Sequence, residues 1–166
     1  PPVTAHGGSD ECGIVVVGAV TDGPPQDWHA VVLEDASLRG ATPQQWAQAA
    51  IAAMARHGAD RLVAEVNQGG DLVERLVRMI DPLVPYRAVH ATRSKMLRAE
   101  PVAALYEQGR VAHVRGLGAL EDQMGKMTVQ GWQGAGSPDR LDALVWALTD
   151  LMITPLPNAR PSVRSL

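Results

Sequence analysis

Two acidic residues stand where a carboxylate could do chemistry rather than only face water. Glu65 comes near the end of a short run whose other members are all apolar, Leu62-Val-Ala-Glu-Val66. Because burying an unpaired charge is costly, such a carboxylate serves a site, pairs with a basic residue or points to solvent at the end of the sheet. Asp142 lies about 100° around a predicted helix from Leu141, at the border of the apolar stripe. It can therefore face the edge of a sheet without leaving the helix surface.

The other acids near Asp142 point elsewhere. At about 100° per residue, Asp139 lies about 160° and Asp150 about 180° from the centre of the stripe at Leu141. Asp139 is an additional candidate metal ligand, although an acid in a first helical turn more commonly interacts with the helix macrodipole.

Carboxylates that converge from a strand end and a facing helix favour hard cations such as Mg²⁺ or Mn²⁺. Two such ions about 3.5 to 4 Å apart would clamp the attacking and leaving oxygens of a phosphodiester. The five histidines form no close pair and Cys12 is the single cysteine, so zinc is not expected. Gly7-Gly8 and Gly116-Leu117-Gly118 lack the lysine and hydroxyl residue of a phosphate-binding loop, so no ATPase function is expected.

Length and composition limit the class of protein in which this chemistry could occur. A chain of 166 residues with 46% apolar residues is enough for one domain with one core. The sequence has neither an apolar run long enough to span a membrane nor an export signal at its start. The single cysteine fits a reducing compartment, and we expect the host-cell cytoplasm.

The net charge of −3 argues against a strongly basic nucleic-acid binder, but one segment is locally basic. Between residues 87 and 115, six basic residues face two acidic ones. The segment could form a phosphate-binding face or simply a solvated helix surface. The basic residues are Arg87, Arg93, Lys95, Arg98, Arg110 and Arg115.

The elements that must position these residues alternate between strands and helices. The β-branched run Gly13-Ile-Val-Val-Val-Gly-Ala-Val20, the turn at 22–25 and the apolar residues 28–33 predict a hairpin. Thr42-Pro43-Gln44-Gln45 predicts a capped helix start, and Gly58 predicts its end. Further along the chain we predict strands over 62–66, 86–90 and 111–114, and helices over 71–80, 101–108 and 138–152, with one helical turn near Leu120.

A hairpin followed by alternating strands and helices predicts an α/β fold with a mixed sheet flanked by helices. We place the domain at residues 1–154. The segment 155–166, rich in proline and poor in apolar residues, is expected to be a flexible tail.

Four motifs in order carry a family resemblance. They are Ser9-Asp10-Glu11-Cys12-Gly13-Ile-Val-Val-Val-Gly, Ala64-Glu65-Val-Asn-Gln-Gly-Gly70, Ser94-Lys95 with Arg98-Ala-Glu-Pro101, and Ser137-Pro-Asp-Arg-Leu-Asp-Ala-Leu-Val145. Together they resemble the C-terminal nuclease domain of the large terminase subunits of phages, prophages and gene transfer agents, over the chain up to about Met152.

The resemblance implies a ribonuclease H-like fold whose acidic cluster binds Mg²⁺ or Mn²⁺, as a two-metal site, and cuts concatemeric double-stranded DNA during genome packaging. By motif, Glu65 and Asp142 are the implied catalytic metal ligands, and Asp10 matches a supplementary acidic position. Lys95, Arg98 and Arg93 are our candidate DNA contacts. The implied partners are double-stranded DNA, the portal and the small terminase subunit, with no membrane.

The chain departs from the family pattern at its start. The family's first strand ends in an aspartate followed by proline, whereas this sequence opens on Pro1-Pro2. We therefore predict a fragment of a longer terminase, with the first strand truncated and the ATPase domain absent. The alternative function is a catalytically incomplete fragment that acts as a DNA- or packaging-partner-binding module.

Overall fold

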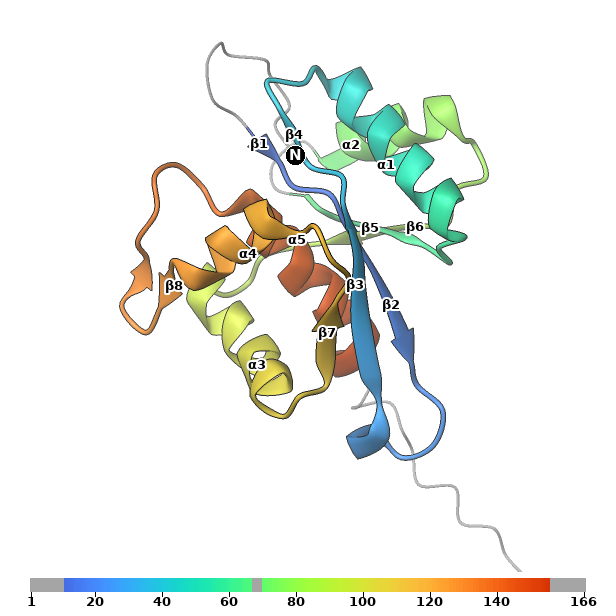
Figure 1. Ribbon diagram of the computed structural model, residues 1–166. Helices are drawn as coiled ribbons and strands as arrows, with labels where there is room; N and C mark the ends of the chain where they lie inside the picture. The colour runs from blue at the N-terminus through green and yellow to red at the C-terminus, as the bar shows by residue number, and fades with distance from the viewer. Residues whose placement is uncertain (1–10, 67–69, 156–166) are drawn as a thin grey trace, which may run out of the picture.

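A long antiparallel hairpin runs through the middle of the molecule (Figure 1). In the computed structural model of the chain, residues 11–66 and 70–155 are described. The hairpin joins β2 (Val15–Val20) to β3 (His29–Asp35) through a short 3₁₀ turn, Pro25–Asp27. Strand β7 (Val111–His113) pairs in parallel with the other edge of β3, so the β2-β3-β7 sheet is mixed. The predicted hairpin and mixed sheet are confirmed.

Three smaller strand pairs complete the β structure. Strand β5 (Leu62–Glu65) pairs in parallel with β6 (Tyr86–Val89), and β1 (Glu11–Cys12) pairs antiparallel with β4 (Leu38–Arg39). Strands β8 (Met127–Thr128) and β9 (Gly131–Trp132) form a short antiparallel hairpin. Within residues 11–66 and 70–155, no strand pairing joins β5 to β2.

A cavity of about 360 Å³ lies between β2 and β5. Its lining includes Gly13 to Ala19, which lie in β2 and just before it, and Leu62 to Glu65 of β5. Helices α1 (Pro43–His57) and α5 (Asp139–Leu148) contribute small side chains such as Ala53 and Ala143 to its lining. The cavity therefore lies between two strands that belong to separate sheets.

Helix α1 begins and ends where its sequence predicts. The Thr42 hydroxyl accepts from the Gln45 backbone N–H, and the Gln45 side chain accepts from the Thr42 backbone N–H, so the capping box is complete. Gly58 closes the helix at φ +58°, a conformation that glycine adopts without steric cost. Helix α2 (Gly70–Ile80) packs beside α1, on the side of the molecule away from α3 and α4 (Figure 1).

Helix α3 (Lys95–Glu107) is longer than the sequence predicted. We expected it to begin at Pro101, but Pro101 lies inside the helix. The reason is Ser94, whose side chain accepts from the Leu97 backbone N–H and caps the helix before the proline is reached. The predicted helical turn near Leu120 is a full helix, α4 (Gly118–Gly125).

The closing helix has a buried face that the sequence did not reveal. Helix α5 continues as a π-helical turn, Thr149–Ile153, which contains Asp150. We expected Asp150 on the solvent side, yet only 7% of this residue is exposed. The expectation was wrong because α5 packs on two sides: Ala143, Ala147 and Asp150 line the cavity next to β5. Arg87 and Arg61 neutralise the Asp150 carboxylate, at 2.5 and 3.4 Å.

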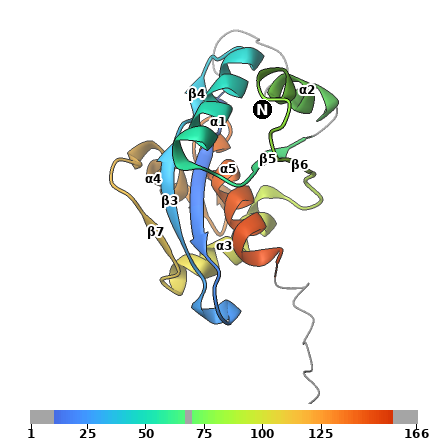
Figure 2. The same cartoon turned by 90° about the vertical axis from the view of Figure 1, so that its right-hand side faces the viewer.

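The apolar residues gather in two clusters. The first joins the β2-β3-β7 sheet to α3, α4 and α5, around Val32, Leu120 and Leu144. The second joins α1, α2, β5 and β6, around Trp46 and Val77. Figure 2 shows α5 between the hairpin and the β5–β6 pair, and it contacts both. None of the helices in the described ranges is long and apolar enough to cross a membrane.

Cys12 in β1 belongs to the second cluster, and the reactivity of its thiol can be used to measure how well this cluster is buried. Only 4% of the residue is exposed, and burial raises the pKa of its thiol to about 11. Because the thiolate is the reactive form, we expect a disulfide reagent to modify Cys12 slowly at pH 8 in the native protein and much faster in denaturant. Absorbance of the released thiol follows both reactions, and equally fast modification in the two conditions would contradict the burial.

Candidate metal site

Glu65 and Asp142 meet around one guanidinium group. Glu65 is the last residue of β5, and Asp142 lies in the first turn of α5. Arg98 of α3 lies between them: its Nη1 is 3.6 Å from Glu65 Oε2, and its Nη2 is 3.8 Å from Asp142 Oδ1. Two carboxylates that are far apart in sequence therefore lie near the same guanidinium group.

A lysine reaches Asp142 from the other side. Lys95, the first residue of α3, forms an ion pair with Asp142 Oδ2, and its ammonium donates to Ser137 Oγ at 2.7 Å. The Asp142 side chain is 13% exposed. Burial raises the pKa of Asp142 above its usual value, Lys95 and Arg98 oppose that shift, and the charge of Glu65 adds to it. The two carboxylates therefore repel each other and need cations nearby.

Trp146 supports the pair from within the same helix. Its indole Nε1–H donates to Glu65 Oε2 at 3.0 Å. Its ring lies against Arg98, with the guanidinium carbon 4.8 Å from the ring centroid. Trp146 follows Asp142 by four residues, so one face of α5 carries both side chains.

The other predicted site residues are Asp10, Asp139 and Arg93. Asp10 lies outside the described residues. Asp139 is the half-buried first residue of α5, and Arg93 is exposed in the segment before α3. Among residues 11–66 and 70–155, no three histidine, cysteine or acidic side chains come together as a metal-binding group. Of the three predicted ligands within the described residues, Glu65 and Asp142 share contacts with Arg98.

The donor set at this place still fits a hard cation. Mg²⁺ is commonly held by one or two carboxylates, with water and substrate phosphates completing its octahedron. Glu65 and Asp142 supply two carboxylates, each in contact with a cationic side chain. The described residues therefore suit one divalent ion rather than two, and a second would need a ligand from elsewhere.

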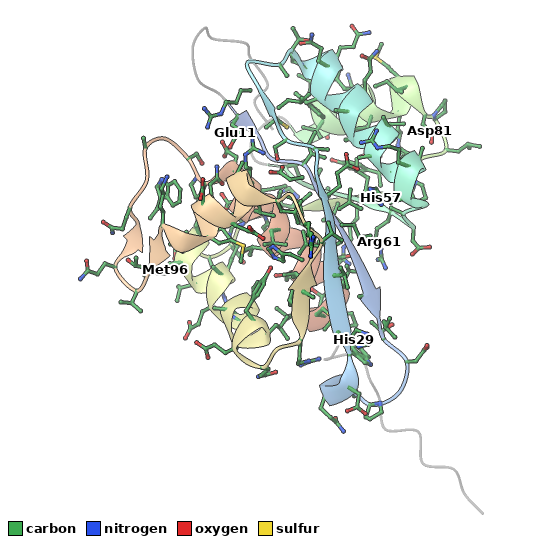
Figure 3. All side chains as sticks on the ribbon, viewed as in Figure 1. Glu11, His29, His57, Arg61, Asp81 and Met96 are labelled. Carbon is green, nitrogen blue, oxygen red and sulfur yellow. The ribbon has the colours of Figure 1, made fainter. Side chains whose placement is uncertain are left out.

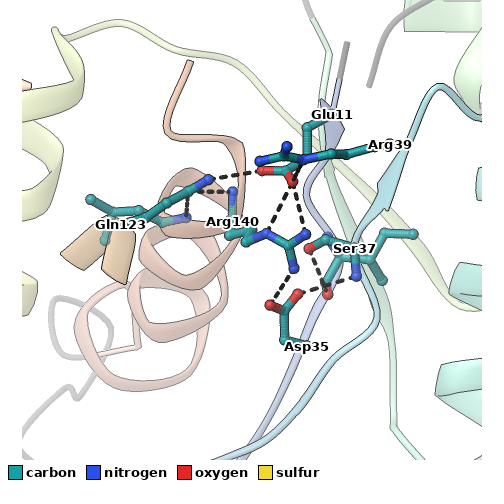
Figure 4. Close-up of polar contacts among 8 residues, drawn as sticks. Glu11, Asp35, Ser37, Arg39, Gln123 and Arg140 are labelled. Carbon is teal, nitrogen blue, oxygen red and sulfur yellow. Dashed lines mark hydrogen bonds and ion pairs between the residues drawn. The ribbon is translucent and has the colours of Figure 1, made fainter. Parts of the chain in front are cut away.

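A second charged group holds the start of α5 in place (Figure 4). The Arg140 guanidinium donates to Glu11 Oε1 at 2.8 Å and to Asp35 Oδ2 at 2.5 Å. Arg39 donates to the same oxygen of Glu11, and Gln123 donates to its other oxygen, at 3.0 and 2.8 Å. Burial raises the pKa of the Glu11 carboxyl, but these hydrogen bonds together hold its pKa below the usual value. The network links β1, β3, β4, α4 and α5.

The segment at Gly13 also abuts α5. A Cβ added at Gly13 would lie 1.9 Å from the backbone oxygen of Asp139. No side chain fits at this position unless the helix start moves, so Gly13 lets the backbone after β1 approach α5 within three residues of Asp142.

Several residues of this region escaped the sequence analysis. The role of Trp146 could have been found from its spacing of four from Asp142 on a predicted helix. Arg98 was proposed as a DNA contact, and nothing in its local sequence signals that its side chain is only 10% exposed. His29 and His57 do not form a pair: Figure 3 shows His29 by the closed end of the hairpin and His57 at the end of α1, far from each other.

The mixed sheet and its flanking helices form an RNase H-like α/β domain. The family model described as the terminase RNase H-like domain matches residues 2–151. The chain belongs to this family.

Solved structures similar to this one agree with that assignment. The large terminase nuclease of the thermophilic phage G20c with bound cobalt has a TM-score of 0.57 and 21% identity, covering 82% of this chain and 81% of that one. The same nuclease with bound magnesium has a TM-score of 0.56 at the same identity and coverage. A search among curated proteins found no match.

Proposed function

We propose that this chain is the nuclease domain of a large terminase subunit and that it cuts concatemeric double-stranded DNA with Mg²⁺ or Mn²⁺ during genome packaging. The observation that carries the proposal is the meeting of Glu65 and Asp142 around Arg98. The similar G20c nuclease has been crystallised with magnesium and with cobalt, which supports a divalent ion here.

In this proposal, Glu65 and Asp142 hold the ion. A bound divalent ion supplies Lewis-acid stabilisation of charge on the phosphate and activates water. Lys95 pairs with Asp142 in this structure, and with an ion on Asp142 its ammonium would be available to a phosphate oxygen, because a flexible lysine can exchange one anionic partner for another. A two-metal arrangement would draw its further ligands from Asp10 and Asp139.

The three proposed DNA contacts differ in their surroundings. Arg93 is exposed, and 42% of the Lys95 side chain is accessible. Arg98 is 10% exposed and packed on Trp146, which favours a role within the site over contact with a DNA backbone. We therefore propose Arg93 and Lys95 as phosphate contacts, and the portal and small terminase subunit as protein partners.

The experiment that tests the function is nicking of supercoiled plasmid by the purified chain. We expect nicking with Mn²⁺ or Mg²⁺ and none with EDTA. Conversion of supercoiled to open-circular DNA on agarose gels measures the rate. Nicking that is unaffected by EDTA would contradict a metal-dependent mechanism.

A second function is favoured by the cavity between β2 and β5. Within residues 11–66 and 70–155, no strand pairs with the edges of β2 and β5 that line the cavity, and an extended segment can be added at such an edge. If the active protein carries a strand there, this chain alone is an incomplete nuclease and acts as a DNA- or packaging-partner-binding module. The matched test is a protein extended upstream of Pro1: nicking by the extended protein alone supports the incomplete-module function, and equal nicking by both proteins rejects it.

A further inference from the structure

Trp146 contacts both a proposed metal ligand and the cation between the two ligands. Its indole Nε1–H donates to Glu65 Oε2 at 3.0 Å, and its ring packs against the Arg98 guanidinium at 4.8 Å. Because Trp146 also follows Asp142 by one helical turn, it contacts Glu65 and Arg98 from the helix that carries Asp142.

The contact with Glu65 determines which carboxylate oxygen is available. Both Trp146 and Arg98 approach Oε2, and no hydrogen bond from the described residues reaches Oε1. A carboxylate on a strand end can rotate about its side-chain bonds, and a fixed donor to one oxygen selects one orientation. The indole N–H therefore leaves the second oxygen of Glu65 for a cation.

The contact with Arg98 compensates for missing hydrogen bonds. The Nε and Nη1 groups of Arg98 are buried without a hydrogen-bond partner in the described structure. Its separations of 3.6 and 3.8 Å from Glu65 and Asp142 are those of charge attraction and longer than hydrogen bonds. The guanidinium therefore takes its position from the face of the Trp146 ring, where a desolvated cation is attracted by the π-electrons.

We propose that Trp146 is the positioning residue of the metal site: it orients Glu65 through its indole N–H and holds Arg98 between the two carboxylates through its ring. The inference rests on the proposed metal-dependent function and adds a residue that the metal itself does not touch. Trp146 acts on metal affinity through Glu65 and Arg98.

The test compares two tryptophan-to-phenylalanine variants. Trp146→Phe keeps an aromatic ring and removes the N–H that Glu65 accepts. Trp28→Phe removes an equivalent indole N–H, which donates to the Gly23 carbonyl in the hairpin turn. We expect Trp146→Phe to weaken Mn²⁺ binding, measured by electron paramagnetic resonance of the free ion, by on the order of tenfold or more, as removal of partners of metal ligands does elsewhere. Trp28→Phe should bind within about twofold of the unaltered chain.

A second measurement, hydrogen exchange of the Trp146 indole proton, is made without metal and starts from the unaltered chain. In the metal-free chain, the Trp146 indole proton should exchange slowly with solvent in NMR spectra, and Glu65→Ala should accelerate the exchange. An indole proton that exchanges as fast as in a free peptide overturns the positioning role, as does Mn²⁺ binding by folded Trp146→Phe within twofold of the unaltered chain. An unaltered chain that takes up no Mn²⁺ overturns the metal site and the proposed function instead.

Discussion

Alanine in place of Glu65 or Asp142 is expected to lower the rate of Mn²⁺-dependent plasmid nicking by on the order of a thousandfold. The physical reason is that each variant removes one of the two carboxylates that meet around Arg98. Stabilisation of phosphate charge by a metal amounts to several kcal/mol, and each ~1.4 kcal/mol corresponds to a factor of ten in rate. Initial rates from gel densitometry measure the effect, with circular dichroism to verify that both variants are folded.

The matched controls are acids on neighbouring helices. Glu100 on α3 and Asp122 on α4 are exposed, and we expect Glu100→Ala and Asp122→Ala to nick at nearly the unaltered rate. Equal nicking by the unaltered chain and by both site variants would mean that the activity comes from a contaminating nuclease. That outcome would refute the acidic pair as the catalytic centre.

Arg140→Ala is expected to destabilise the domain by about 3 to 5 kcal/mol, the usual cost of removing one partner of a buried ion pair. Arg140 is 14% exposed, and it bonds Glu11 and Asp35, whose side chains are 6% and 7% exposed. Without the guanidinium, two carboxylates stay buried close to each other. Urea denaturation followed by circular dichroism measures the loss, which is a large share of the roughly 5 to 15 kcal/mol that holds an ordinary domain together.

Arg39→Ala provides the matched comparison. Arg39 bonds the same oxygen of Glu11, yet its side chain is 77% exposed, so we expect a loss below about 1 kcal/mol. The difference between Arg140→Ala and the unaltered chain should also depend on pH. Because the pKa of Glu11 is lowered in the folded state, its pairing stabilises the protein above its ordinary pKa of about 4.5, and that contribution disappears as the pH falls further. Similar losses in both variants at pH 7 would contradict the central role of Arg140.

Local signals in the sequence predicted the elements well where a few adjacent residues decide the structure. The β-branched run before Asp22 and the capping box at Thr42 act over four to eight residues, and the hairpin and α1 follow from them. The start of α3 was wrong because the cap at Ser94 outweighs the lost N–H of Pro101. A proline predicts the start of a helix only where no capping residue begins the helix further upstream, and Ser94 does so ahead of Pro101.

The two candidate ligands could be chosen from the sequence, but the side chains around them could not. Glu65 and Asp142 stood out as acids among apolar neighbours, and both lie within 4 Å of Arg98. Burial of Arg98 and of Asp150 depends on how α5 packs against β5 and α3, which periodicity along one helix does not reveal. When a helix has two buried faces, polar residues on the second face are buried, although a single apolar stripe in the sequence predicts that they face solvent.

The interior is divided into two hydrophobic clusters, and the distance between Glu65 and Asp142 depends on how these clusters are held together. Asp142 lies on α5, which contributes Leu144 to the first cluster, and Glu65 ends β5, which packs against the cluster around Trp46. The distance between the two carboxylates therefore depends more on how the two clusters are placed relative to each other than on the packing within each cluster. A subglobal opening along the cavity would pull the carboxylates apart while every helix stayed intact. The site would then lose its geometry well before the secondary structure melts.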